Sequence, residues 1–281
     1  LLVLDQLRGD HSTGAAFISQ KGDIEVVKVM GGATDLLGNT RFIKRLALES
    51  KALIGHNRYA TIGKQNKSNA HPFEFSSIVG AHNGTLRDYR DLDGYGDFGT
   101  DSETLYHHAD KFGMEDALSK ITGAFALTYY DKDEDRMVFA RNTERPLFIA
   151  VLENNALVWA SEDWMLHVVL RRSHEHKVLN IFELKKDTLV SYDLKDLSFK
   201  ETKITTKPST LHYNRYPSTT HNYRKSIRCK IIGKATEGKS SWWTIEEVGN
   251  PQYKGRLSVL LTKDVSFGDL LYLDQSYKSS H

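Results

Sequence analysis

Three short segments carry polar residue types that buried strands do not need for packing. The apolar run before Arg58 ends in a guanidinium, whose planar fork suits a carboxylate. A second apolar run ends in Asn83 and Gly84, which offer a side-chain amide donor and an accessible backbone N–H. Two such donors could hold a developing oxyanion. Asp101 places a carboxylate at the start of a predicted helix. The set therefore combines a cation, an anion and a candidate oxyanion site.

Each of these residues also has an ordinary structural interpretation when it is taken alone. Arg58 could belong to a structural ion pair, and Asn83-Gly84 is a common hairpin turn. Asp101 could simply cap its helix, and His71 could be a satisfied polar residue. No single residue of the set therefore identifies a function.

The order of the motifs along the chain resembles the glutaminase domain of class II, N-terminal-nucleophile (Ntn) glutamine amidotransferases. That family includes amidophosphoribosyltransferases, hexosamine-phosphate synthases, asparagine synthetases and glutamate synthases. The resemblance extends from residue 1 to about residue 193. It rests on the segments 8–14, 55–61, 69–72, 82–84, 100–103, 123–127, 141–147 and 160–162.

The resemblance implies a four-layer αββα sandwich and a role for each matching residue. Arg58 is expected to bind the α-carboxylate of L-glutamine, and Asp101 its α-amino group. Asn83 and Gly84 are expected to form the catalytic oxyanion hole. Three further residues are expected to shape the wall of the substrate pocket: Tyr59, Thr61 and His71. We expect neither a metal nor a cofactor.

The family's nucleophile is a cysteine at the mature N-terminus, and this sequence begins with Leu1. Residues 1–7 match the helix that follows the family's first strand, so we expect that strand and its cysteine to lie upstream. The one cysteine, Cys229, lies in the C-terminal tail and has no free α-amine. An inactive relative that serves as a binding or assembly module, or an Ntn amidase for another amide, remain the alternatives.

Helices and strands are expected in blocks rather than in strict alternation, which favours an α+β fold with antiparallel sheets. Strands are predicted over 15–18, 24–30, 52–55 and 77–81, in four short runs between 123 and 160, and between 178 and 204. Helices are predicted over 35–49, 102–111, 114–121 and 163–172, with Asp101 or Ser102 capping the second.

The chain is expected to comprise a glutaminase domain over 1–207, a linker over 208–222 and a small β-rich module over 223–281. Residues 233–240 fit the phosphate-loop pattern, but too few residues follow for a nucleotide-binding sheet. A hairpin turning at Glu237-Gly238 is the preferred interpretation. The tail from residue 208 holds 11 Lys/Arg against 6 Asp/Glu, an excess too modest to predict nucleic-acid binding.

The composition is that of an ordinary soluble protein, with 40% hydrophobic and 26% charged residues. No apolar run approaches the roughly 20 residues of a membrane span, and a single cysteine fits the reducing cytoplasm. The expected partners are L-glutamine and an ammonia-accepting synthetase, or a second copy bound through the C-terminal module.

Overall fold

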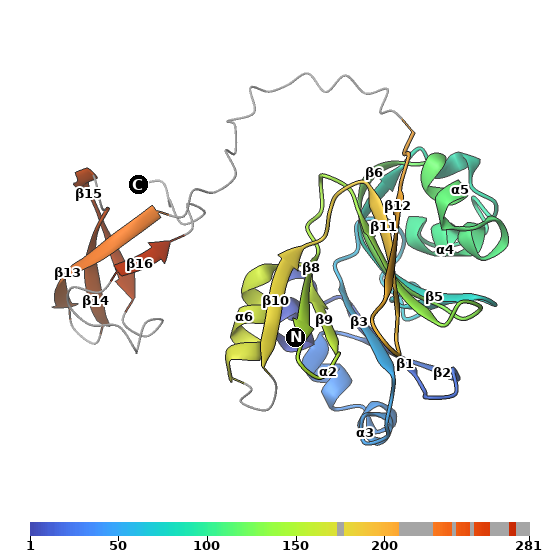
Figure 1. Ribbon diagram of the computed structural model, residues 1–281, viewed down its shortest axis with the longest axis horizontal. Helices are drawn as coiled ribbons and strands as arrows, with labels where there is room; N and C mark the ends of the chain where they lie inside the picture. Colours follow the sequence, from blue (N-terminus) through green and yellow to red (C-terminus); the bar gives the residue numbers. More distant parts are fainter. Residues whose placement is uncertain (173–176, 208–226, 238–239, 248–249, 259–269, 274–281) are drawn as a thin grey trace. The chain divides into compact units, whose positions relative to one another are not determined.

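The computed structural model describes residues 1–172, 177–207, 227–237, 240–247, 250–258 and 270–273. The chain divides into two compact units, Leu1–Thr210 and Leu211–His281. Every residue with a predicted role in binding or catalysis lies in the first unit, which is drawn in blue to yellow in Figure 1.

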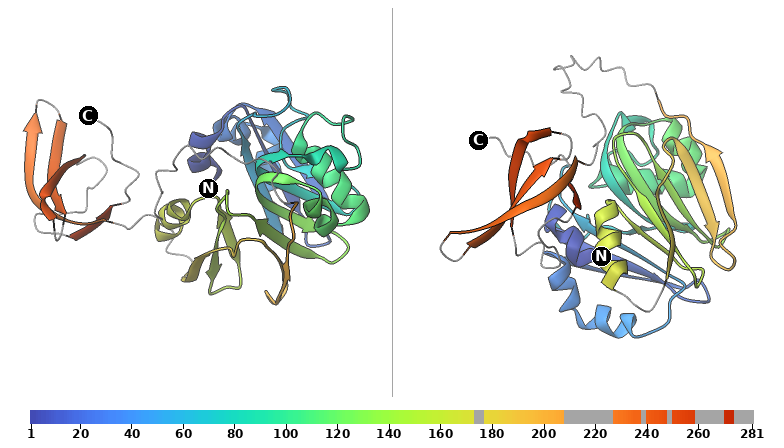
Figure 2. Two further views of the ribbon diagram at one scale, coloured as in Figure 1. Left: turned by 90° about the horizontal axis from the view of Figure 1, so that it is seen from above. Right: turned by 60° about the vertical axis from the view of Figure 1, so that its left-hand side comes forward.

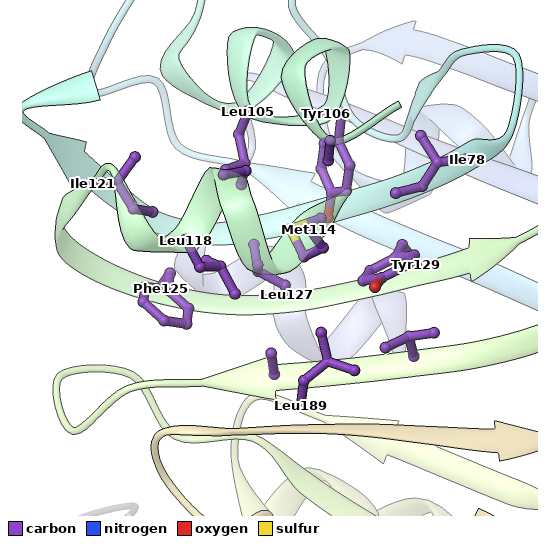
Figure 3. Packing of buried hydrophobic residues seen from close by; sticks show 14 of the residues in the cluster. Ile78, Leu105, Tyr106, Met114, Leu118, Ile121, Phe125, Leu127, Tyr129 and Leu189 are labelled. Atoms are coloured by element: carbon purple, nitrogen blue, oxygen red, sulfur yellow. The ribbon is translucent and has the colours of Figure 1, made fainter. Parts of the chain in front are cut away.

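A six-stranded antiparallel sheet forms one central layer of the first unit, with the strand order β12-β11-β7-β6-β5-β4. Two helices, α4 and α5, cover one face of this sheet. Figure 3 shows the packing between them, where Leu105 and Tyr106 of α4 meet Phe125 and Leu127 of β6. The elements are β4 Phe73–Glu74, β5 Ile78–Arg87, α4 Asp101–Phe112, α5 Met114–Ser119, β6 Thr122–Asp131, β7 Arg136–Arg141, β11 Thr188–Asp193 and β12 Phe199–Lys203.

Two three-stranded antiparallel sheets, β2-β1-β3 and β10-β8-β9, pack against the other face of the large sheet. Ala16 and Ile54 of the first sheet and Ile149 of the second join Val79 and Phe139 of the large sheet in one buried cluster. These strands are β1 Ser12–Ile18, β2 Ile24–Met30, β3 Ala52–Arg58, β8 Phe148–Leu152, β9 Leu157–Ala160 and β10 Val178–Glu183. The two small sheets therefore share one layer.

Helices complete the sandwich on the outside of that layer, as Figures 1 and 2 show. Leu36 of α2 and Phe42 of α3 cover Phe17 and Val27 of the β1–β3 sheet. Met165 and Leu166 of α6 cover the β8–β10 sheet, where they meet Leu1 and Leu4. The elements are α1 Leu2–Asp5, the 3-10 helix η1 Gln6–Arg8, α2 Ala33–Leu37, α3 Thr40–Leu46 and α6 Asp163–Arg172. The predicted α+β, four-layer αββα fold is confirmed.

Two local predictions were wrong, and the ordinary interpretation of Asn83-Gly84 as a hairpin turn does not hold. The single helix over 35–49 is two helices, because Gly38 ends α2 and the Asn39 side chain caps α3 by accepting from the Phe42 N–H. The cap of α4 is Thr100, whose hydroxyl accepts from the Glu103 N–H, and not Asp101 or Ser102. The pair Asn83-Gly84 lies inside β5, which continues to Arg87, and forms no hairpin turn.

The second unit contains a four-stranded antiparallel sheet in the order β15-β14-β13-β16. Its strands are β13 Ile227–Glu237, β14 Ser240–Glu247, β15 Asn250–Ser258 and β16 Leu270–Leu273. Glu237 pairs with Ser240, so the predicted hairpin is confirmed. The predicted linker over 208–222 lies outside the described residues, and so do the side chain of Cys229 and any self-association surface of this unit. Over the described residues, every helix is too short or too polar to span a bilayer.

Candidate active site

One cavity of about 410 Å³ in the first unit is lined by all seven residues that the sequence nominates for the site. The cavity lies between the two sheet layers, where polar residues at the end of β3 and in the middle of β5 line it. Its walls come from β3, β5, the start of α4 and the end of β9. Residues separated by up to 43 positions in the chain therefore meet in one place: Arg58, Tyr59, Thr61, His71, Asn83, Gly84 and Asp101.

Arg58 ends β3 and is only 4% exposed. Its guanidinium donates to the Ile62 carbonyl at 2.6 Å and to the Lys64 carbonyl at 3.2 Å. Burial lowers the pKa of Arg58, and the negative charge of Asp101 opposes that effect. The ordinary interpretation as an ion pair is wrong for the described residues, because loop carbonyls rather than a carboxylate hold the guanidinium. Arg58 also lines the cavity, and a guanidinium has five N–H donors.

Gly84 occupies a backbone conformation, φ +151°, that residues with a side chain rarely adopt. A Cβ on this glycine would approach the Ala124 carbonyl oxygen to 2.0 Å. Its cross-strand partner on β6 is Phe125. The Phe125 carbonyl accepts from the Asn142 N–H, and the Phe125 N–H donates to the Asn142 side-chain oxygen, so both groups point toward β7. The Gly84–Phe125 pair is therefore not hydrogen-bonded, and the Gly84 N–H faces away from β6. Asn83, half-buried, adds its side-chain amide to the same cavity wall.

Asp101 stands in the first turn of α4 and is 4% exposed. One of its carboxylate oxygens accepts a hydrogen bond from the Leu86 N–H at 2.7 Å, and the other lies 3.4 Å from the Ser102 hydroxyl. The Ser102 hydroxyl is nearer to His82 Nδ1, at 2.9 Å. Because His82 Nε2 donates to the Ala124 carbonyl, its Nδ1 is the acceptor of the Ser102 proton. The contact of Ser102 with Asp101 is therefore the weaker of the two contacts that this hydroxyl makes.

The segment after β3 forms a loop over the cavity mouth. The Tyr59 ring is 63% exposed and stacks on His11, with ring centroids 4.6 Å apart. The Ala60 N–H donates to His11 Nδ1 at 2.9 Å. The Thr61 and Thr85 hydroxyls lie 3.1 Å apart and join this loop to β5 just beyond Gly84. Tyr59 and Thr61 therefore belong to the rim of the cavity.

His71 lies deeper, at 4% exposure, and its ring centroid is 4.2 Å from that of His56. Burial lowers the pKa of His56 to about 3 and that of His71 well below its usual value. Neighbouring cationic and imidazole groups add to the effect at both rings. Both imidazoles are therefore neutral at physiological pH. Within the described residues, no group of three side chains is arranged to hold a metal ion.

The edges of β3 and β9 face each other across a second cavity, lined by Ala52, Leu53 and Gly55 on one side and by Leu157, Val158 and Trp159 on the other. Among the described residues, both strands are edge strands of their sheets. The first cavity continues this gap, since it is lined by residues 55–58 of β3 and by residues 159–161 at the end of β9. We refer to this gap as the β3–β9 slot.

Sequence reasoning missed the residues that brace the slot. The Asn57 side chain donates to the Leu2 carbonyl at 2.8 Å and to the Asp5 carboxylate at 3.1 Å. The Ser161 hydroxyl donates to the other Asp5 oxygen at 3.3 Å. Asp5 therefore links β3 to the segment that follows β9. The signal for this role in the sequence was the carboxylate of Asp5 within the otherwise apolar start of the chain.

Residues 56–168 match a protein family described as a glutamine amidotransferase domain. The chain is 28% identical over 183 residues to a glutamine–fructose-6-phosphate aminotransferase of Buchnera aphidicola, covering 59% of this chain and 30% of that protein. It is 29% identical over 184 residues to the chloroplastic amidophosphoribosyltransferase 2 of Arabidopsis thaliana, covering 58% and 32%. The chain therefore spans about a third of the length of these curated relatives.

Solved structures show the same likeness. A glutamine phosphoribosylpyrophosphate amidotransferase from B. subtilis, complexed with ADP and GMP, is similar with a TM-score of 0.58 and 25% identity. The match covers 73% of this chain and 46% of that one. A structure described as the allosteric regulatory enzyme of purine biosynthesis gives the same TM-score and identity over 71% and 44%. The resemblance read from the motifs is confirmed: residues 56–168 match a glutamine amidotransferase domain, and the αββα unit is similar to glutamine amidotransferases of the class II, N-terminal-nucleophile family.

Proposed function

We propose that this domain hydrolyses L-glutamine to L-glutamate and ammonia, and that the ammonia passes to an acceptor. The observation that carries the proposal is the convergence of Arg58, Asn83, Gly84 and Asp101 on one cavity. A buried guanidinium, a buried carboxylate and two outward N–H donors are the complement of a zwitterionic amino acid with a side-chain amide.

The arrangement supports one orientation of the substrate. Arg58 would receive the α-carboxylate, because its guanidinium is buried and already oriented by two loop carbonyls. Asp101 would receive the α-ammonium through the carboxylate oxygen that Leu86 leaves free. The side-chain amide would then extend toward β5, where the Asn83 side chain and the Gly84 N–H would bind its carbonyl oxygen.

For the nucleophile we propose a cysteine on a strand that precedes Leu1 and occupies the β3–β9 slot. The slot supports this proposal because both facing edges carry unpaired backbone groups that an inserted strand could bond. If the N-terminal end of this strand lies beside residues 55–58 of β3, its first residue would enter the cavity next to Asn83 and Gly84.

The proposed chemistry depends on the α-amino group and the thiol of the N-terminal cysteine, which lie next to each other. The α-amino group of the cysteine accepts the thiol proton, and the thiolate adds to the amide carbon. The oxyanion forms against the donors of Asn83 and Gly84. The carbon–nitrogen bond then breaks as the ammonium proton moves to the leaving nitrogen, which departs as ammonia and leaves a thioester. Water hydrolyses the thioester to glutamate and restores the thiol.

The two curated relatives carry names of enzymes that aminate fructose 6-phosphate or act as phosphoribosyl amidotransferases. We propose a separate synthetase partner or a second copy bound through the C-terminal unit, and the cytoplasm as the compartment. The division into a glutaminase domain over 1–207, a linker over 208–222 and a module over 223–281 also stays a prediction.

The direct test is the glutaminase activity of the full-length gene product with its natural N-terminus. Purified protein should release glutamate from L-glutamine, and Asn83→Ala should remove most of that activity while the thermal midpoint stays unchanged. Intact mass and N-terminal sequencing should show a mature cysteine. A folded, cysteine-initiated protein with no glutaminase activity, alone or with candidate acceptor enzymes, would contradict the proposal.

A further inference from the structure

Three residues at the polar end of the sheet interface hold side-chain atoms that lack protein partners. Among the described residues, five buried side-chain atoms have no hydrogen-bond partner, and four of them belong to Ser12, His56 and His71. These are the Ser12 hydroxyl oxygen, His56 Nδ1 and both ring nitrogens of His71. Buried polar atoms in folded proteins are nearly always paired, so the unpartnered nitrogens of the two neighbouring imidazole rings indicate a partner that both rings could bind.

Strand register places Ser12 and His56 on one face of the β1–β3 sheet. Gly14 pairs with His56 across β1 and β3, and Ser12 lies two residues earlier on the same face of β1. A Cβ on Gly14 would approach the His71 carbonyl oxygen to 2.2 Å, so the glycine lets the His71 segment lie directly on β1. The His71 ring then stacks 4.2 Å from the His56 ring, and both rings line the candidate active-site cavity.

The hydrogen-bonding capacity of the rings defines what could pair with them. The nearby backbone of His82 raises the pKa of His56 against the larger effect of burial, and His56 Nδ1 has no partner, so we assign the proton of the neutral ring to Nε2. His56 Nδ1 is therefore an acceptor in the neutral ring. Neutral His71 offers one donor and one acceptor, and the Ser12 hydroxyl can do either. The missing partner must both donate and accept hydrogen bonds.

The environment of the rings disfavours a cation as that partner. Burial is the main cause that holds the pKa of His71 well below its usual value, and repulsion from neighbouring groups, Lys28 and Arg58 among them, adds to it. Lys28 is itself held nearby, with its ammonium 4.7 Å from the centre of the Phe73 ring. An ammonium ion would meet the same repulsion, and it could offer no acceptor to the His71 N–H.

We propose that Ser12, His56 and His71 form a binding site for one small neutral molecule that both donates and accepts hydrogen bonds, either water or unprotonated ammonia. The ammonia alternative rests on the proposed function, because amide hydrolysis at Asn83 and Gly84 would release ammonia into the same cavity. A site that repels ammonium would keep the product as the free base, the form that can act as a nucleophile. The water alternative needs no catalytic activity.

The test is imidazole ¹⁵N NMR of the full-length protein, titrated with ammonium chloride at two pH values one unit apart. If ammonia binds, the His56 and His71 nitrogens shift, and the half-saturating total ammonium falls about tenfold at the higher pH, in step with the free base. If water occupies the site, the rings show a long-lived water contact and no response to ammonium. His108 is the internal control, since Asp93 and Asp116 occupy both of its ring nitrogens.

Two results would overturn the site. One is the absence of both an ammonium response and a long-lived water contact at His71. The other is a response that depends on total ammonium regardless of pH, because that would show a cation bound. His71→Phe should abolish the response of His56. If this variant does not fold, Ser12→Ala should weaken the response and leave His108 unaffected. These readouts need no turnover, so an inactive protein that shows them would contradict the proposed function and leave the site standing.

Discussion

The Asp101 carboxylate accepts a 2.7 Å hydrogen bond from the Leu86 N–H, which ties the first turn of α4 to β5 two residues beyond Gly84. The same carboxylate borders the cavity. The residue proposed to bind the substrate ammonium therefore also positions the strand proposed to bind the oxyanion. Substrate recognition and oxyanion geometry are coupled through one side chain.

We predict that Asp101→Asn raises the KM for L-glutamine about 100-fold, because a charged hydrogen bond of roughly 2–3 kcal/mol is lost. The amide oxygen of asparagine can still accept from Leu86, so the thermal midpoint should change little. Asp101→Ala should weaken binding similarly and also lose about 1–3 kcal/mol of stability, because the buried Leu86 N–H loses its partner. Steady-state kinetics and urea unfolding check both variants, with Asp97→Asn in an exposed loop as the control.

We predict that Asn83→Ala lowers kcat by about 100- to 1,000-fold with a small change in KM, as expected for an oxyanion donor that acts in the transition state. Its unfolding midpoint should stay close to that of the parent, because Asn83 is only half-buried. Stopped assays at saturating glutamine measure kcat. An Asn83→Ala variant with full kcat would remove Asn83 from the oxyanion hole.

Gly84→Ala should behave differently, with a loss of stability of several kcal/mol alongside the loss of activity. The added Cβ would overlap the Ala124 carbonyl oxygen at 2.0 Å, and φ of +151° is strained for alanine. Chemical denaturation of Asn83→Ala and Gly84→Ala in parallel separates a loss of catalysis from a loss of stability. Gly96→Ala is a matched control for positive φ, because a Cβ at Gly96 meets nothing within 4 Å.

Lys28 should make stability depend on alkaline pH. Burial lowers the pKa of Lys28 from 10.5 to about 8, against the opposing charges of Glu103 and Glu74. The unfolded chain binds more protons between these two values, so the free energy of unfolding should rise from pH 8 to pH 10.5. Below pH 8 the full cost of charging this half-buried ammonium is present.

Lys28→Met should therefore stabilise the protein at pH 7 by about 2–3 kcal/mol, and the gain should vanish near pH 10.5. Urea unfolding at pH 7 and at stepped alkaline pH measures it. Lys44→Met, at an exposed position of α3, controls for the general effect of removing a charge. A gain that is constant across this pH range would exclude a lowered pKa at Lys28.

Asp5→Ala should loosen the slot, because it removes the carboxylate that Asn57 and Ser161 share. Asn57 keeps its bond to the Leu2 carbonyl, so we expect a modest loss of about 1 kcal/mol. Amide hydrogen exchange should become faster in α1 and at the end of β3. Asp10→Ala, at an exposed position, should leave the exchange of both segments unchanged.

The spacing of apolar residues and the positions of turn residues were enough to predict most helices and strands. This spacing follows from the burial of one face of each element. The failures occurred where two local signals competed. The apolar spacing over 35–49 continues through Gly38 and Asn39, yet Asn39 is a better cap than helix interior. Asn83-Gly84 has the composition of a turn, but pairing with β6 on one side holds it within a strand.

The residues of the candidate site could be predicted only where they belong to the sequence motifs that resemble the family. All seven nominated residues line one cavity, although their individual roles stay predictions. The links that shape the cavity join distant positions, such as Asp5 with Ser161 and His56 with His71, and no local pattern reports such contacts. The unpartnered nitrogens of His71 are likewise visible only when the surrounding strands are in place.

The β3–β9 slot has a further consequence for how this polypeptide must be handled. Two strand edges with free N–H and C=O groups are a template for any extended segment, including the same segment of another molecule. Residues 1–210 expressed from Leu1 would present both edges together, with the apolar side chains of Leu53 and Leu157 beside them. Such a fragment should be prone to aggregation and strand exchange, and a short peptide able to fill the slot should act on it as a folding aid.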